Sequence, residues 1–294
     1  MRVLVTIPHV FHPQGSGKNG SLSPNPQPRI AALTQCLQAL HGIYSPAQFY
    51  FKYTDNLQIF AANQDNNFQL DIIICTSQGL HLLNEINIST KYYQHYPLQC
   101  DLKLLGFECH AVLKENLGKY DYYCYLEDDL ILSDPYFLKK LAWFTENLGD
   151  NCLLQPNRFE LVINSDKIAK YYIEVEVQMK TGVQENFAHH FQDNLTVGLN
   201  FLGQYVIIKR AANPHAGCFF LNAAQMEYWA KQNYFLDKDI RFFGPLESAA
   251  SLGIAKAFRI YKPAPENANF LEIKHYGEAC SNLLLQNQEE ITFK

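Results

Sequence analysis

Runs of apolar residues alternate with amphipathic stretches along the first half of the chain. Continuous apolar character predicts buried strands at 2–8, 71–77 and 120–126. Apolar residues recur at helical spacing over 29–40 and again over 98–117. Strands that alternate with helices in this order predict an α/β fold with a mixed sheet.

Short apolar segments become denser in the second half of the chain. Along the whole chain, the pattern also predicts strands at 48–53, 57–61, 152–154, 171–177, 204–208, 218–221, 258–261 and 270–275, and helices at 133–147, 222–231 and 246–252. The sequence shows no internal repeat and no linker. We therefore expect a single domain over residues 1–294.

The segment 9–28 cannot form a regular element, because glycine and proline are too frequent in it. A loop of this length beside a strand is often functional. Its stretch from His12 to Lys18 is superficially similar to a phosphate-binding P-loop. That motif needs Gly six positions before the Lys and Ser or Thr after it, but His12 and Asn19 stand there. We therefore exclude an NTPase of this type.

Charge excludes another class of partner. The chain of 294 residues has 24 Lys and Arg against 29 Asp and Glu, a formal net charge of −5. A protein that grips a phosphate backbone needs a cationic surplus, so we expect no nucleic-acid partner.

The chain shows no sign of a membrane span or an oxidising compartment. No apolar run approaches the roughly 20 residues that cross a bilayer. The N-terminus lacks the apolar core and cleavage site of a signal peptide. The eight cysteines are scattered without a Cys-x-x-Cys pair, which favours reduced thiols. We expect a cytoplasmic protein, and peripheral contact with a membrane stays open.

Three consecutive carboxylates form the strongest local feature. Glu127, Asp128 and Asp129 follow one apolar strand directly and precede a second apolar segment, 130–132. Carboxylates gathered in an apolar setting repel one another and lose solvation, and a divalent cation is the usual compensation. Oxygen ligands suit Mg²⁺ or Mn²⁺. The alternative is a solvated acidic turn, although the apolar flanks on both sides disfavour it.

The strand followed by Glu127-Asp128-Asp129 resembles the Asp-x-Asp motif of GT-A fold glycosyltransferases. The resemblance implies a Rossmann-like α/β sandwich with a central mixed, mostly parallel sheet flanked by helices. It implies a donor half at 1–130 and an acceptor half at 131–294. It further implies Mn²⁺ or Mg²⁺ held by Asp129, with Glu127 and Asp128 binding metal-held water, ribose or donor sugar.

Two later segments also match the family. Glu247, at a predicted helix start, resembles the second acidic motif, which implies a catalytic base that deprotonates an acceptor hydroxyl. His275, at the end of a late strand, resembles the C-terminal His that completes metal or diphosphate binding. The alternatives are a helix-terminal acid stabilised by the helix dipole and an ordinary packed His.

Softer matches concern the donor. The segment 215–222, with Gly217, resembles the small-residue segment beneath a bound sugar, or it is a core strand that leads into a capped helix. Thr6, Pro8 and His9 stand where the family binds nucleobase and ribose, and the loop at 15–21 is a candidate to close over the donor.

A further polar cluster lies outside these motifs. His189, His190 and Asp193 are interpreted as loop or surface residues, because neighbouring residues on a strand point to opposite sides.

The leading hypothesis is a metal-dependent glycosyltransferase. It would move a sugar from a UDP- or GDP-linked donor to a glycan or other hydroxyl acceptor, with inversion. One alternative is a metal-dependent phosphohydrolase or nucleotidyltransferase, which also needs clustered acids. The other is a non-catalytic GT-A-like protein that binds nucleotide or glycan.

Overall fold

The structure is a computed structural model that describes residues 1–14, 20–53, 56–64, 68–163, 168–173, 196–278 and 280–282. Its helices are α1 (Gln27–Tyr44), α2 (Leu105–Glu115), α3 (Phe137–Leu148), α5 (Ala223–Ala230) and α6 (Pro245–Ala257). Short 3₁₀ turns lie at η1 (Gly20–Leu22), η2 (Thr90–Tyr92), η3 (Leu102–Leu104) and η4 (Pro265–Phe270).

A five-stranded sheet forms the centre of the molecule, in the order β13-β6-β1-β4-β5. The strands are β1 (Arg2–Pro8), β4 (Gln69–Ser77), β5 (Gln94–Leu98), β6 (Tyr122–Leu126) and β13 (Cys218–Asn222). β1 runs parallel to β4 and β6, β4 runs parallel to β5, and β13 is antiparallel to β6. The predicted α/β class, with a mixed and mostly parallel central sheet, is confirmed.

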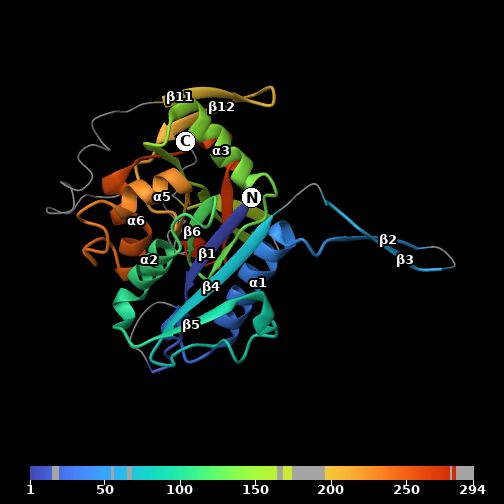
Figure 1. The fold of residues 1–294 in the computed structure, drawn as a ribbon, viewed down its shortest axis with the longest axis vertical. Helices are drawn as coiled ribbons and strands as arrows, with labels where there is room; N and C mark the ends of the chain where they lie inside the picture. The colour runs from blue at the N-terminus through green and yellow to red at the C-terminus, as the bar shows by residue number, and fades with distance from the viewer. Residues whose placement is uncertain are drawn as a thin grey trace.

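Both faces of this sheet are buried, which explains why its strands are apolar throughout. On β1, Val3 and Val5 belong to one core cluster with α1 and α3, whereas Leu4 belongs to a second with α2, α5 and α6. Alternate residues of β4, β6 and β13 divide between the two clusters in the same way. Figure 1 shows α1 on one side of the sheet and α2, α5 and α6 on the other.

Two smaller sheets carry the chain beyond β6. One has the order β10-β9-β15-β7, and the other β11-β12-β14-β8. Their strands are β7 (Leu130–Ile131), β8 (Cys152–Leu154), β9 (Asn157–Ile163), β10 (Ile168–Tyr172), β11 (Thr196–Phe201), β12 (Gln204–Arg210), β14 (Arg259–Pro263) and β15 (Glu272–His275). The antiparallel pairing of β15 with β7 sets His275 opposite Leu130, directly after the acidic triplet. This register brings two predicted site segments together.

A two-stranded hairpin projects from the body (Figure 1). It consists of β2 (Phe49–Lys52) and β3 (Gln58–Ala61), which pair with each other and with no third strand in the described part of the chain. We call the described residues 49–53 and 56–61 the arm.

Several element boundaries differ from the sequence-based expectation. The helix predicted over 98–117 begins at Leu105, because Leu98 ends β5 and a 3₁₀ turn intervenes. The strand predicted over 171–177 is β10, which ends at Tyr172. The short helix predicted over 246–252 continues to Ala257. Strands β5, β7, β9 and β11 were not predicted.

Two further findings bear on the chemistry of the chain. All eight cysteines are free, and six of them lie in apolar core clusters on both sides of the sheet: Cys36, Cys75, Cys109, Cys124, Cys152 and Cys218. Within the described ranges, no helix has both the length and the apolar character that a membrane crossing requires.

Candidate functional site

The acidic triplet lies where the chain reverses direction across the central sheet. From β1 the chain reaches its neighbour β4 on one side and later returns to β6 on the other side. In open α/β sheets, such a switch point leaves a crevice outside the carboxyl ends of the strands. His9 follows β1, and Glu127 to Asp129 follow the parallel strand β6, so these side chains meet at the crevice.

Asp128 is the most buried member of the triplet and is held by two partners. Its side chain is 2% exposed and lies 2.5 Å from His9 Nδ1 and 2.9 Å from an Arg29 guanidinium nitrogen. His9 Nε2 accepts a hydrogen bond from the backbone N–H of Leu82, so the proton of the neutral ring sits on Nδ1 and is donated to Asp128. These partners satisfy a buried charge that would otherwise be costly.

Asp129 is more open than Asp128. Arg29 donates to Asp129 Oδ2 over 2.9 Å, and His275 Nε2 lies 3.8 Å from the same oxygen. Oδ1 is buried without a hydrogen-bond partner. Burial raises the pKa of Asp129, but the charges of Arg29 and His275 outweigh it and hold this pKa below its ordinary value. Asp129 is therefore ionised at neutral pH and has one free lone-pair site.

Glu127 is the member of the triplet whose charged form is least stabilised. Burial, followed by the charge of Asp129, raises the pKa of Glu127 to about 8, and its Oε1 has no partner. Gly217 packs beneath it: a Cβ there would lie 2.8 Å from Glu127 Oε2, and φ at Gly217 is +66°. Glycine is required at this position for its backbone conformation and for the approach of the carboxylate.

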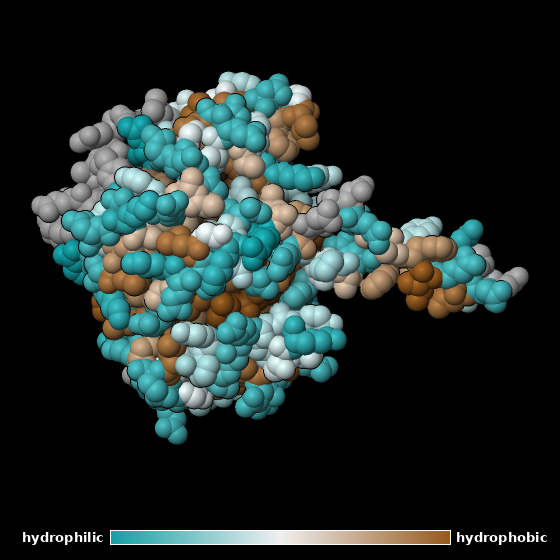
Figure 2. Space-filling view, viewed as in Figure 1, coloured by the Kyte–Doolittle hydropathy of each residue, from teal (hydrophilic) through white to brown (hydrophobic). Residues whose placement is uncertain are grey.

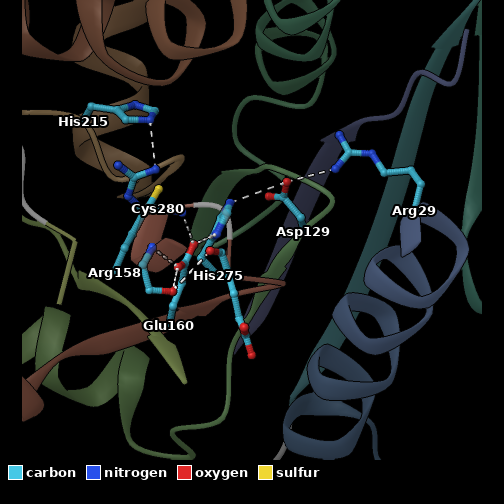
Figure 3. A network of polar contacts seen from close by, with 9 residues as sticks. Arg29, Asp129, Arg158, Glu160, His215, His275 and Cys280 are labelled. Atoms are coloured by element: carbon cyan, nitrogen blue, oxygen red, sulfur yellow. Dashed lines mark hydrogen bonds and ion pairs between the residues drawn. The ribbon is translucent and has the colours of Figure 1, made fainter. Parts of the chain in front are cut away.

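A carboxylate behind His275 fixes the direction of its ring. Glu160, on β9, lies 2.9 Å from His275 Nδ1 and also accepts hydrogen bonds from Ser281 and the backbone of Cys280. Burial raises the pKa of Glu160, but these hydrogen bonds prevail and lower it to about 2. Because Nδ1 is engaged, Nε2 faces Asp129, as Figure 3 shows. Such a carboxylate partner is typical of metal-ligating histidines.

These groups open into one cavity of about 590 Å³. Its wall includes Glu127, Asp129, Arg29, Arg158 and His275, and Glu247 from the first turn of α6. A volume of this size lies within the usual range for small-molecule sites.

A cationic side of the same wall faces the acids. Arg158 NH1 donates to His215 Nε2 over 3.3 Å, while His215 Nδ1 lies 3.0 Å from the Ser251 hydroxyl. Burial, followed by the charges of Arg158 and Lys262, lowers the pKa of His215 well below its usual value. His215 is thus a neutral support that orients Arg158, whose Nε is buried without a partner.

The structure brings together four of the predicted site residues: Glu127, Asp129, Glu247 and His275 line the same cavity. Others support the site from behind, namely His9 and Asp128 through their contact and Gly217 beneath Glu127. Thr6 and Pro8 are buried in β1, and the Thr6 hydroxyl donates to the Cys124 carbonyl of β6. A donor-binding role for Thr6, Pro8 and His9 stays a prediction.

Some predictions fall elsewhere in the chain. Residues 15–19 of the candidate closing loop lie outside the described residues, as do His189, His190 and Asp193. Ser21, at the end of that loop, does line the cavity.

Four residues of the site were not predicted from the sequence: Arg29, Arg158, Glu160 and His215. Arg29 belongs to an unremarkable amphipathic helix, and its two ion pairs join residues 99 and 100 positions apart. Arg158 and Glu160 lie on β9, which the apolar pattern did not reveal. His215 belongs to the segment 215–222, which was considered only for its small residues.

The oxygen and nitrogen atoms at this wall of the cavity fit a divalent cation as its ligands. Asp129 Oδ1 and Glu127 Oε1 are buried and unpartnered, and His275 Nε2 is aimed at Asp129. Carboxylate oxygens and an imidazole nitrogen suit Mn²⁺ and Mg²⁺. Among the described residues, no three His, Cys, Asp or Glu side chains gather closely enough to hold a metal alone. The remaining ligands would have to come from water or from substrate phosphates, as is usual for Mg²⁺.

Comparisons with known proteins concern the fold. No protein-family model matches the sequence, and no curated protein matches it. The solved structures similar to this chain include crystal structures of S. aureus TarS. For TarS 1-349 in complex with UDP-GlcNAc, the identity is 12% and the TM-score 0.43, over 93% of this chain and 58% of that one.

Two more crystal structures of TarS are similar to this chain at the same sequence identity. The complex of TarS 1-349 with UDP has 12% identity and a TM-score of 0.44, over 93% of this chain and 60% of that one. A structure of TarS has 12% identity and a TM-score of 0.46, over 100% of this chain and 41% of that one. The chain thus spans about half of the TarS chains.

Proposed function

We propose that this chain is a metal-dependent glycosyltransferase that moves a sugar from a nucleotide diphosphate sugar to a hydroxyl acceptor. One observation supports the proposal most. A single cavity holds an oxygen-rich edge that suits a cation, two arginines and a separate carboxylate, Glu247. Cation and arginines together suit a diphosphate, and the separate carboxylate suits a general base.

Each part of the wall has a role in the transfer. Glu247 accepts the proton of the acceptor hydroxyl, whose oxygen forms a bond to the anomeric carbon of the donor sugar. The bond from that carbon to the diphosphate oxygen breaks, and its electron pair leaves with the nucleoside diphosphate. A base and a leaving group on opposite faces of the sugar give inversion. Glu247 is held in the first turn of α6, where Pro245 fixes the first helical position.

Asp129, His275 and Glu127 would hold Mn²⁺ or Mg²⁺, which supplies Lewis-acid stabilisation of the leaving diphosphate when bound. Arg29 offsets part of the negative charge of Asp128 and Asp129 and so lowers the net negative charge that an anionic donor meets. Arg158, oriented by His215, offers donors on the opposite wall. UDP- and GDP-sugars are the donor class that we expect.

The proposal is tested by calorimetric titration of UDP- and GDP-sugars in the presence of Mn²⁺, followed by turnover assays with the donor that binds. We expect binding of diphosphate forms only, loss of binding and turnover with EDTA, and a product of inverted anomeric configuration by NMR. Undiminished turnover in EDTA would contradict the metal role. Faster hydrolysis of plain nucleotides or phosphoesters would contradict sugar transfer.

A further inference from the structure

One exposed aromatic side chain belongs to the cavity itself. Many of the exposed hydrophobic side chains, Phe49 and Ile59 among them, gather on the projecting arm (Figure 2). Of the large hydrophobic side chains that are exposed in the described part of the chain, Phe243 alone lines the cavity. Its side chain is 57% exposed. An aromatic ring left open at the wall of a small-molecule site is available to a ligand.

The segment before α6 holds Phe243 in place. The backbone N–H of Phe242 donates over 3.1 Å to the hydroxyl of Ser248, which is fully buried. The backbone N–H of Ser248 donates in turn to the carbonyl of Gly244. The rings of Phe242 and Phe243 lie 4.6 Å apart at an angle of 60°, an edge-to-face arrangement that favours two aromatic rings. A ligand that meets Phe243 therefore pays little to order it.

Ion pairs secure the same segment at its other end. Arg241 contacts both carboxylate oxygens of Asp239, at 2.9 and 2.8 Å. Lys256, in the last turn of α6, lies 2.6 Å from an oxygen of Asp237. The two cations that hold this segment are therefore engaged by its own carboxylates. A neutral ligand suits such surroundings better than an anionic one, which would need a cation free to pair with it.

Phe243 lies next to the carboxylate of Glu247. A Cβ added at Gly244 would collide with Glu247 Oε2, so this carboxylate packs directly against the residue that follows Phe243. Leu246 lines the cavity on the other side of Gly244 in the sequence. In the proposed inverting transfer, the base stands on the face of the sugar opposite to the leaving diphosphate. Apolar side chains beside the base therefore lie on the acceptor side of the cavity.

We propose, on the basis of the proposed function, that Phe243 is a specificity-determining residue on which a pyranose ring of the acceptor stacks. The acceptor is then a sugar ring and not an open-chain alcohol. The C–H hydrogens on one face of a pyranose carry slight positive charge and meet the negative face of an aromatic ring. The hydroxyl groups lie at the edge of the pyranose, where one of them reaches Glu247. An open-chain polyol has the same hydroxyl groups but no rigid apolar face.

Saturation-transfer difference NMR on the full chain tests the proposal. The probes are the methyl β-pyranosides of glucose, galactose and N-acetylglucosamine at about 5 mM, a concentration suited to affinities near 1 mM. Sorbitol, the open-chain counterpart of glucose, is the matched control ligand. We expect saturation of the ring C–H protons of at least one pyranoside and none of sorbitol. Phe243→Ala should weaken pyranoside binding about 3- to 10-fold, and Phe243→Tyr, which keeps the ring, should restore it.

Tyr228→Ala is the matched control variant. Tyr228 is 53% exposed, close to the value for Phe243, but it lies on α5 and is not part of the cavity wall. It should leave pyranoside binding unchanged. Calorimetric titration of the nucleotide sugar should give the same affinity for Phe243→Ala as for the unaltered chain, while the KM for the acceptor rises. Because both positions are exposed, unchanged circular dichroism and melting temperature verify that the variants fold.

Three results would overturn the role of Phe243. The first is saturation of no pyranoside, or of sorbitol to the same extent. The second is pyranoside binding that is equal in Phe243→Ala and the unaltered chain. The third is weaker binding of the nucleotide sugar in Phe243→Ala, which would place the ring under the nucleobase or the donor sugar. In contrast, a chain that binds no nucleotide sugar but loses pyranoside binding in Phe243→Ala would contradict the proposed function alone.

Discussion

The cavity and the arm depart from the ordinary partition of side chains in opposite directions. The cavity buries carboxyl groups, Asp128, Glu127 and Glu160 among them, whereas the arm exposes aromatic side chains. Both arrangements cost free energy in isolation, since buried charges lose hydration and exposed apolar groups order water. The two regions differ in where the compensation comes from.

In the cavity, most of the compensation lies within the chain itself. Asp128 has His9 and Arg29, and Glu160 has His275 and Ser281. What stays unsatisfied is concentrated at the wall, at Glu127 Oε1 and Asp129 Oδ1. In the arm, the described part of the chain offers the apolar side chains no cover. In the cavity, the unsatisfied oxygens of Glu127 and Asp129 mark where a bound ligand would supply the missing partners.

The largest effect that would sharpen this comparison concerns Glu247. Glu247→Gln keeps the shape of the side chain but removes the base, so we expect kcat to fall about 10²- to 10⁴-fold with donor affinity retained. Glu227→Gln, on the exposed face of α5, is the matched control and should leave kcat unchanged. Steady-state kinetics and calorimetry measure the two quantities. A near-normal kcat for Glu247→Gln would remove it as the base.

Gly217 tests whether the acids depend on close packing from below. Gly217→Ala forces a Cβ against Glu127 at a φ of +66°, and we expect a loss of about 2–4 kcal/mol in the free energy of unfolding. Gly79 is the matched control, because its φ is +72° and its Cβ position is open. Gly79→Ala should cost only about 1–2 kcal/mol. Urea titrations measure the free energy of unfolding of both variants. Equal losses would show that the Glu127 side chain moves aside without cost.

Substitution of Glu160 tests whether the carboxylate hydrogen-bonded to His275 supports metal binding. Glu160→Gln removes the charge that orients the ring, and we expect Mn²⁺ affinity to fall about 10- to 100-fold. Glu272→Gln, on the same strand as His275 but paired with Lys170 at the surface, should leave this affinity unchanged. Calorimetric titration of Mn²⁺ measures both. Equal Mn²⁺ affinities of the two variants would contradict the role of Glu160.

His110 is a buried polar group outside the cavity. We expect it to lower the free energy of unfolding at acidic pH and to have no part in the site. Five aromatic rings surround it, and burial lowers its pKa to about 3. The unfolded chain therefore binds the extra proton between pH 6.5 and 3, and stability falls as the pH falls through this range.

For His110, the expected slope is roughly 1.4 kcal/mol for each pH unit below 6.5. His110→Phe should remove this contribution, as seen by comparing urea unfolding of both proteins at pH 7 and pH 5. An unchanged slope in the variant would show that His110 is charged in the folded state or stays neutral in both states.

The sequence revealed those parts of the fold that rest on local pattern. The apolar runs located β1, β4 and β6, and Asn222 with Gln225 located the start of α5, where the structure has a full capping box. The triplet at 127–129 was visible because three charges interrupt two apolar segments. Glu247 and His275 were found through the resemblance of their segments to a family.

Arg29, Arg158 and Glu160 could not be found in this way. Each is an ordinary surface-type residue in the sequence and becomes part of the site only through pairing across the fold. The register of β15 on β9 and β7 decides that Glu160 meets His275, and no local pattern encodes that register. The missing strands β9 and β11 have mixed polar and apolar residues and low contrast with their flanks.

The pairing of β15 with β7 also has a consequence for synthesis. Glu160 and His275 are 115 positions apart, and Arg29 and Asp129 are 100 apart, so the wall closes only through long-range contacts. Contacts of this kind form late, because loop closure must precede them. A growing chain can complete its central sheet while the strand that carries His275 has yet to emerge from the ribosome. Under the proposed function, turnover would begin only after the last part of the fold has docked, and the onset of turnover would then report complete assembly.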